Sequence, residues 1–276
     1  ARLIERGHTP TALILPGPPS VDQPILLSRP VAGLPMAGMP SAIAKANVPT
    51  YQIGRLRSRA TRDLIRSLTP DLLVVACFPR RISRELTEIA HLAAINLHPS
   101  LLPRHRGPDP LFWIMRDGGE GCGVTVHLLA DRFDAGAIVA QREVTYPDGV
   151  SEVELERLLA TVGADLTTDA ITALVTGAPP PTPQDERSAT YESWPVERDF
   201  AVERSWPVQR AYNFIRGVRH RGIPVRINTE DCAYVAVDAI EFGSGQCDPT
   251  SPDPGLTSIQ FDDGWLVVRL AGVSQT

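Results

Sequence analysis

Apolar and polar positions follow two different patterns along the chain. In the first two thirds, short apolar runs alternate with stretches of helical periodicity, which is typical of a helix-covered, mostly parallel sheet. The run DLLVVACF at Asp71–Phe78 is continuously apolar and predicts a parallel strand buried on both faces. The other strands expected here are Thr11–Leu15, Ala94–His98, Val124–Leu129 and Ile138–Val144.

Helical periodicity is clearest at Ser151–Thr176. Ser151 and Glu154 form a capping box at its start, and Gly177 is a C-terminal stop signal. The stretch Pro16–Pro40 is rich in proline and glycine and predicts a loop. Shorter helices are expected at Arg55–Leu68, Ser83–His91, Asp109–Arg116 and Trp206–Ile215, and Ala1–Gly7 has the pattern of a helix end.

The last third has the second pattern. Gly177–Asp185 (GAPPPTPQD) has the composition of a linker. Short strand-like segments follow, at Val225–Asn228, Ala233–Ile240, Ser258–Gln260 and Trp265–Ala271. They predict a small β-barrel or sandwich. We therefore expect an α/β domain at 1–176, a linker at 177–192 and a β domain at 193–276.

Composition narrows the class of protein. The chain has 276 residues, of which 43% are hydrophobic and 21% charged, and this excludes a disordered protein. No apolar run approaches the ~20 residues that span a membrane. The four cysteines are scattered without a C-x-x-C pair, which argues against a zinc site or disulfide scaffold and favours the cytoplasm. The net charge of −5 lies entirely in Asp185–Thr276, with 9 basic against 14 acidic residues.

Candidate chemistry is concentrated between residues 95 and 144. Asn96 and His98 lie two apart on a short strand that ends at Pro99, so their side chains leave the same face at the strand's carboxyl end. Asp134 lies between two predicted strands and is followed by Gly136. An amide donor, an imidazole and a carboxylate can stabilise an oxyanion and move a proton. On spacing alone, a structural role for the Asn–His pair stays open.

Four motifs in this region resemble those of the 10-formyltetrahydrofolate-dependent formyltransferase family. They are Asn96-Leu97-His98, Ser100-Leu101-Leu102-Pro103, Arg106-Gly107 and Asp134-Ala135-Gly136. The resemblance implies a Rossmann-like N-terminal domain, Asn96, His98 and Asp134 as catalytic residues, and 10-formyltetrahydrofolate as formyl donor without a metal. It also implies a first strand upstream, so we expect some 15–20 residues, by family resemblance, before Ala1.

The resemblance further implies the positions of the two substrates. Main-chain groups around Arg80–Ile82 and Ala130–Asp134 would bind the pterin. The residues expected at the folate are Arg80, Arg81, Ile82, Ser100, Leu101, Leu102, Pro103, Ala130 and Asp131. Arg106 and Trp113 are expected on the acceptor side.

The sequence points to two kinds of acceptor. Asp199–Gly217 resembles the start of the OB-like C-terminal domain of methionyl-tRNA formyltransferases, whereas Phe112-Trp113 and Gly123–His127 resemble members that formylate amino sugars. Pro16–Pro40 contains a single basic residue, Arg29, where tRNA-formylating members carry a lysine-rich loop.

Charge favours the small acceptor. Because tRNA binding requires cations that neutralise phosphates, the acidic last third points to a small amine, while tRNA stays open as a partner. Two further functions also stay open: a folate-binding protein without turnover, and a hydrolase that releases formate.

Three features allow a second interpretation. His127 on a predicted strand is interpreted as a packed histidine, with a ligand as the alternative. His105, between two arginines, is interpreted as a solvated loop residue, with contact to an anionic substrate as the alternative. The cluster of basic residues at Arg216–Arg221 predicts either a phosphate site or cations paired with nearby acids, and pairing is favoured.

Overall fold

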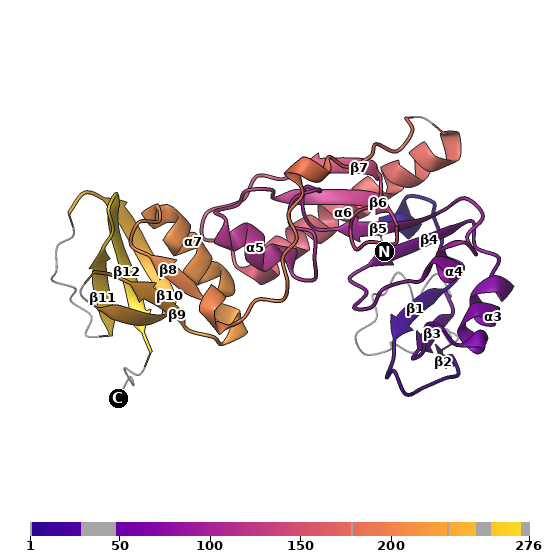
Figure 1. Ribbon diagram of the computed structural model, residues 1–276, viewed down its shortest axis with the longest axis horizontal. Coiled ribbons are helices and arrows are strands. Elements are labelled where there is room, and N and C mark those ends of the chain that lie inside the picture. The colour runs from indigo at the N-terminus through magenta and orange to yellow at the C-terminus, as the bar shows by residue number, and fades with distance from the viewer. Residues whose placement is uncertain (1, 29–47, 178, 231, 247–254, 272–276) are drawn as a thin grey trace. The chain divides into compact units, whose positions relative to one another are not determined.

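The computed structural model describes residues 2–28, 48–177, 179–230, 232–246 and 255–271, and the chain divides into two compact units (Figure 1). Unit 1 comprises residues 1–106, 123–142 and 160–190, and unit 2 comprises residues 107–122, 143–159 and 191–276. The units alternate along the chain, so each is built from segments far apart in the sequence. The domain boundaries expected near residues 176 and 193 stay a prediction.

Unit 1 contains two sheets. The first has the order β1 (Leu13–Pro16), β3 (Thr50–Ile53), β2 (Ile25–Ser28). The second has the order β4 (Leu72–Ala76), β5 (Ala93–His98), β6 (Gly123–Leu128), β7 (Ile138–Glu143). β1 is parallel to β3 and β4 to β5, whereas β2 and β6 pair antiparallel with β3 and β5. A mixed α/β fold with parallel strands is confirmed, but the expectation of a mostly parallel sheet is wrong.

The antiparallel step from β5 to β6 follows from the place of the helix between them. A parallel return requires a crossover that packs on the sheet. Here the connecting helix α5 (Pro110–Arg116) belongs to unit 2, so the chain re-enters the sheet in the opposite direction. β4 also differs from expectation, because its described partner is β5 alone and Val74 is 42% exposed. The prediction of a strand buried on both faces is therefore wrong.

The short helices of unit 1 are α1 (Arg2–Glu5), α3 (Arg59–Ser67) and α4 (Arg84–Thr87). Ser58 caps α3 by accepting a hydrogen bond from the Thr61 amide at 3.0 Å. α4 is much shorter than the predicted Ser83–His91, because the amides of His91 and Leu92 bond to the carbonyls of Pro70 and Asp71.

In unit 1, two short strands fall where none was expected. β2 interrupts the predicted loop Pro16–Pro40, whose remainder from residue 29 lies outside the described residues, and β3 follows at Thr50–Ile53. Each is only four residues long and carries too few positions for a period to stand out.

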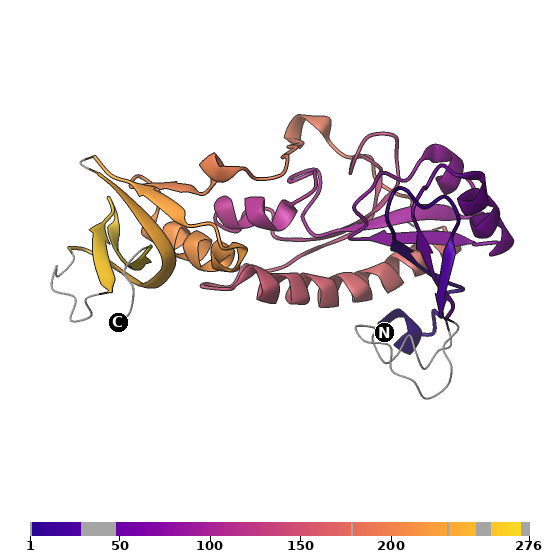
Figure 2. The same cartoon turned by 90° about the horizontal axis from the view of Figure 1, so that it is seen from below.

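The long helix α6 (Glu152–Thr176) lies along one face of the second sheet (Figure 2). Its predicted capping box is confirmed, with the Ser151 amide donating to Glu154 Oε2 at 2.9 Å and the Glu154 amide to Ser151 Oγ at 3.3 Å. At Gly163 a Cβ atom would lie 2.8 Å from the Leu97 side chain, so glycine permits close packing on β5.

α6 is the one described helix that is long and apolar enough to cross a membrane, with a mean hydropathy of 1.4 over its most apolar window. In that window 39% of the residues are buried, and the buried residues of the helix include Leu155, Leu159, Leu166 and Ala170. The cytoplasmic location stays a prediction.

Unit 2 is built on a five-stranded sheet. The strand order is β11 (Leu256–Gln260), β12 (Gly264–Leu270), β10 (Ala233–Ser244), β9 (Val225–Asn228), β8 (Ala201–Glu203). The predicted C-terminal β structure is confirmed, and its closure into an OB-like barrel stays a prediction. Against the sheet lies α7 (Val208–Val218), and α5 packs on α7.

An aromatic cluster forms the core of unit 2 around Phe112. The Phe112 side chain is fully buried, and its ring lies 5.5 Å from that of Phe214 and 5.0 Å from that of Phe200. The Arg221 guanidinium stacks over the Phe112 ring at 5.2 Å. Phe112 therefore joins three segments that are distant in sequence.

We predict that Phe112→Ala lowers the free energy of unfolding by about 3–5 kcal/mol, because it leaves a cavity in this core. Phe133 is 52% exposed, and Phe133→Ala is the matched control, with an expected change within about 0.5 kcal/mol. Urea unfolding of both variants measures the difference. Equal effects would show that the cluster does not form the core of unit 2.

Candidate active site

The register of β5 and β6 brings polar side chains of both strands to one face of the sheet. Leu97 faces α6, so Asn96 and His98, its neighbours on β5, point to the opposite face. Asn96 is paired with His127 of β6, and His98 with Thr125. The predicted pair Asn96 and His98 is thus brought together, and His127 joins it although its sequence pattern predicts only a packing role.

Asp134 reaches the same face from the tight turn between β6 and β7. It adopts a left-handed backbone with φ of 54°. Two residues later, a Cβ atom at Gly136 would lie 1.7 Å from the Leu128 carbonyl oxygen, so only glycine allows the turn to close against β6. The D-x-G motif therefore has a physical basis: Gly136 sets the approach of the turn, and Asp134 then faces the histidines.

Two imidazole nitrogens converge on one carboxylate oxygen. His98 Nδ1 and His127 Nε2 each lie 3.7 Å from Asp134 Oδ1. His98 Nε2 donates to the His105 carbonyl at 2.8 Å, and His127 Nδ1 donates to the Leu128 carbonyl at 2.8 Å. In the neutral rings, the nitrogens facing Asp134 are therefore the ones without a hydrogen. His127 Nε2 in turn accepts from Asn96 Nδ2 at 3.1 Å.

Two opposing influences act on the pKa of His98, its burial and the nearby Asp134 carboxylate. His98 is 4% exposed, and its burial lowers the pKa below the ordinary value. The attraction of Asp134 and the hydrogen bond to the His105 carbonyl act in the opposite direction but do not outweigh burial. Burial therefore favours the neutral form of His98 at pH 7.

His105 is placed differently from the expected solvated loop position. It is 3% exposed and has a left-handed backbone with φ of 55°. This conformation turns its carbonyl toward His98 Nε2. Its role in fixing the His98 ring was invisible to sequence reasoning, because a main-chain carbonyl carries no residue-type signal.

The two segments expected to bind the pterin lie next to each other in the structure. Arg81 Nη2 and Asp131 Oδ1 are 3.7 Å apart, an exposed ion pair that joins them. The Arg80 guanidinium bonds to the carbonyls of Gly17, Ile53 and Gly54, at the carboxyl ends of β1 and β3. This is the edge of an α/β sheet where ligands bind. Ile82 is half-buried and Ala130 exposed.

Ser100–Pro103 forms a buried turn directly after β5. Ser100 Oγ donates to the Arg104 carbonyl at 2.8 Å, and Thr125 Oγ1 accepts from the Leu102 amide at 3.1 Å. The Leu101 side chain packs over Gly123, where a Cβ atom would lie 2.5 Å away. Pro103 follows Leu102 through a cis peptide. The side chains of this turn hold the end of β5 in place.

Neither acceptor-side residue projects freely. Arg106 is 3% exposed, and its guanidinium bonds to Gln184 Oε1 at 2.7 and 3.1 Å and to Glu186 Oε1 at 2.9 Å. Trp113, in unit 2, donates from Nε1 to the Ser193 carbonyl at 3.0 Å. Gln184 was missed by sequence reasoning, because it lies in a stretch with linker composition.

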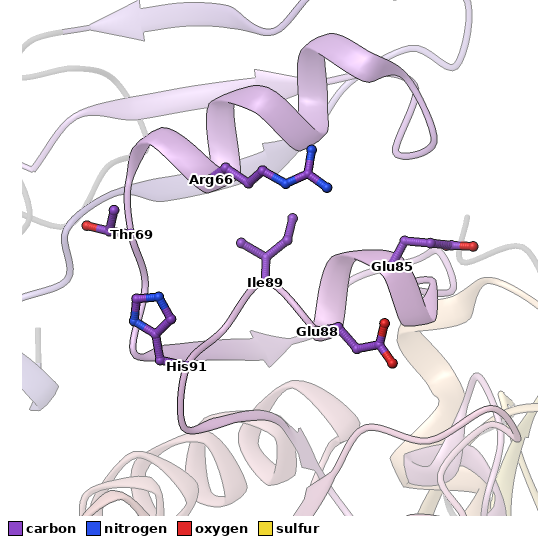
Figure 3. A pocket seen from close by; sticks show the side chains of 6 residues that line it. All are labelled: Arg66, Thr69, Glu85, Glu88, Ile89 and His91. Carbon is purple, nitrogen blue, oxygen red and sulfur yellow. The ribbon is translucent and has the colours of Figure 1, made fainter.

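The cavity in Figure 3 lies elsewhere in unit 1, with a volume of about 560 Å³. Its lining residues are Arg66, Thr69, Glu85, Glu88, Ile89 and His91, from the ends of α3 and α4 and the segment after α4. The predicted site residues are not part of this lining. Among the described residues, no group of three or more His, Cys, Asp and Glu side chains is arranged to hold a metal ion.

Comparisons with known proteins place this geometry in a family. The sequence profile described as formyl transferase matches residues 31–171. The methionyl-tRNA formyltransferase of Moorella thermoacetica is 33% identical over 217 residues, which cover 78% of this chain and 67% of the relative. The chain spans about half the length of some other methionyl-tRNA formyltransferases that it matches.

Solved structures agree with this match at the level of the fold. A HypX variant from Aquifex aeolicus superposes with a TM-score of 0.57 at 16% identity, over 82% of this chain and 41% of the other. An N-formyltransferase from Helicobacter canadensis superposes with a TM-score of 0.52 at 16% identity, over 70% of this chain and 71% of the other. The enzyme class predicted from the motifs, a folate-dependent N-formyltransferase with 10-formyltetrahydrofolate as donor, is confirmed. The chain therefore belongs to the formyl transferase family.

Proposed function

We propose that this protein transfers the formyl group of 10-formyltetrahydrofolate to a small amine, such as the amino group of a sugar, by direct attack. The observation that carries the chemistry is the convergence of His98 Nδ1 and His127 Nε2 on Asp134 Oδ1, at 3.7 Å each. All three atoms can accept a proton, and Asn96 supplies an amide donor beside them.

The reaction requires one proton to move from the amine to the folate. The amine nitrogen attacks the formyl carbon, the carbonyl oxygen gains negative charge, and the bond from that carbon to N10 of the folate then breaks. One N–H of Asn96 is bonded to His127, and its second N–H would stabilise the developing oxyanion. The pair of neutral His98 and ionised Asp134 would accept the proton from the amine and return it to N10.

The choice of a small acceptor rests on charge in unit 2. The basic residues at Arg216–Arg221 have protein partners: Arg219 pairs with Asp238 at 3.1 Å, His220 lies 3.4 Å from Glu152, and Arg221 pairs with Asp109 at 2.7 Å. Pairing with acids, the interpretation favoured from the sequence, compensates the charges of Arg219 and Arg221. A polyanion needs uncompensated cations to bind, whereas a small amine does not.

Charged initiator tRNA is the second candidate acceptor. The name of the Moorella thermoacetica relative, a methionyl-tRNA formyltransferase, favours it. The resemblance of Asp199–Gly217 to the C-terminal domain of that subgroup points the same way. The two candidates differ in acceptor and share the donor and the chemistry at Asp134.

We expect labelled 10-formyltetrahydrofolate to give a formylated product with a small amine from a panel of amino sugars, nucleotide-linked amino sugars and amino acids. Charged initiator tRNA, tested alongside at two salt concentrations, should be formylated much more slowly. Efficient, salt-sensitive formylation of the tRNA would replace the small acceptor by the second candidate. Donor binding without transfer to any acceptor would favour a folate-binding protein without turnover.

We predict that Asn96→Ala lowers kcat by about 10²–10³-fold, because one donor to the oxyanion is lost. Asp134→Asn keeps the shape of the side chain but removes the proton acceptor, so we expect it to lower kcat by about 10²–10⁴-fold. Asp71→Asn is the control, because Asp71 is an exposed carboxylate outside the site. Steady-state rates measure both effects. Each variant should remain folded and bind the formyl donor with near-normal affinity. Unchanged rates in Asn96→Ala and Asp134→Asn would refute these roles.

A further inference from the structure

The segment Thr182–Thr190, here named the strap, is hydrogen-bonded to the loops of the active site at both of its ends. The sequence predicts a linker here, but this part of the chain belongs to unit 1. Thr182 forms a bridge with Ile138, the first residue of β7, with both N···O distances at 2.8 Å. The strap thus begins directly beside the turn that carries Asp134.

Gln184 connects the strap to that turn. Its Nε2 donates to the carbonyls of Asp134 and Gly136, both at 2.7 Å. Its Oε1 accepts two hydrogen bonds from the buried Arg106 guanidinium. Arg106 also bonds to Glu186, which accepts from Arg132 at 3.1 Å. A single amide therefore joins the main chain of the catalytic turn to a buried cation.

Thr190 connects the other end of the strap to the loop that positions His98. Its Oγ1 accepts from the His105 amide at 2.8 Å, and its amide donates to the Pro103 carbonyl at 3.1 Å. Its carbonyl accepts from the Arg106 amide at 3.2 Å. His105 in turn supplies the carbonyl that accepts from His98 Nε2.

The strap therefore contacts both residues of the site that have a left-handed backbone. Asp134 has φ of 54° and His105 has φ of 55°, a backbone conformation that is unfavourable outside glycine. Such residues persist when surrounding contacts over-determine them. Gln184 provides those contacts at Asp134, and Thr190 provides them at His105.

We infer that the strap is part of the catalytic apparatus and that Gln184 is a positioning residue, which holds the Asp134 turn against His98. The expected change in kcat rests on the proposed function, whereas the position of the Asp134 turn can be measured in the free protein. Asp134, His127 and His105 are the titratable groups that act on His98. If the turn loosens, the carboxylate recedes and its attraction for a protonated His98 weakens.

The test compares Gln184→Met, which removes both polar contacts at similar volume, with the wild-type chain. We expect kcat to fall by up to about 100-fold with both KM values unchanged, because the reacting groups are misplaced while the substrates still bind. We also expect the pKa of His98, followed by NMR titration of the free protein, to fall. Gln184→Glu keeps an acceptor for Arg106 but lacks the donor to the turn, so its kcat should fall as well.

Gln260→Met is the matched control. Gln260 in β11 also donates from Nε2 to main-chain carbonyls, those of Gly245, Phe261 and Gly264, but lies in unit 2. It should leave kcat and the His98 pKa unchanged. Wild-type values in Gln184→Met, or a fall in kcat with an unchanged His98 pKa, would overturn the inference. If the wild-type chain formylates no acceptor, the proposed function fails, while the His98 pKa still decides the role of Gln184.

Discussion

The site depends on one buried hydrogen bond, from His98 Nε2 to the carbonyl of His105. A neutral imidazole carries one hydrogen, so placing it on Nε2 leaves Nδ1 as an acceptor toward Asp134. Burial keeps the ring neutral, because the charged form would lose its hydration. Without this bond the ring could turn an N–H toward Asp134 in place of the bare Nδ1.

The surrounding structure serves to hold that bond and its partner carboxylate. His105 and Asp134 both have left-handed backbones, and each lies in a loop that elements distant in sequence must fix. Gly136 lets the Asp134 turn approach β6, while Thr190 and Gln184 bond to the two loops from the strap. A segment with the composition of a linker is therefore hydrogen-bonded to both loops of the candidate active site. This explains how short loops can hold proton-transfer groups in fixed positions.

Local patterns predicted much of this arrangement. The spacing of Asn96 and His98, the capping box at Ser151 and the C-terminal β structure follow from rules that act over a few residues. The antiparallel return to β6 was not predictable, because it depends on α5 belonging to unit 2. The inward turn of Arg106 also depends on residues almost eighty positions away, at Gln184 and Glu186. His127 could have been found from the alternation of β6, had the register with Asn96 been known.

The central claim is that the free protein holds a neutral His98 with its hydrogen on Nε2, so that the bare Nδ1 faces Asp134. ¹⁵N NMR spectra of histidine-labelled protein at pH 7 test it most directly, because the two ring nitrogens shift according to which carries the hydrogen. The structure predicts a hydrogen on Nε2 of His98 and on Nδ1 of His127, with His98 remaining neutral below its ordinary pKa of about 6.5. A protonated His98 at pH 7, or a hydrogen on its Nδ1, would contradict the account.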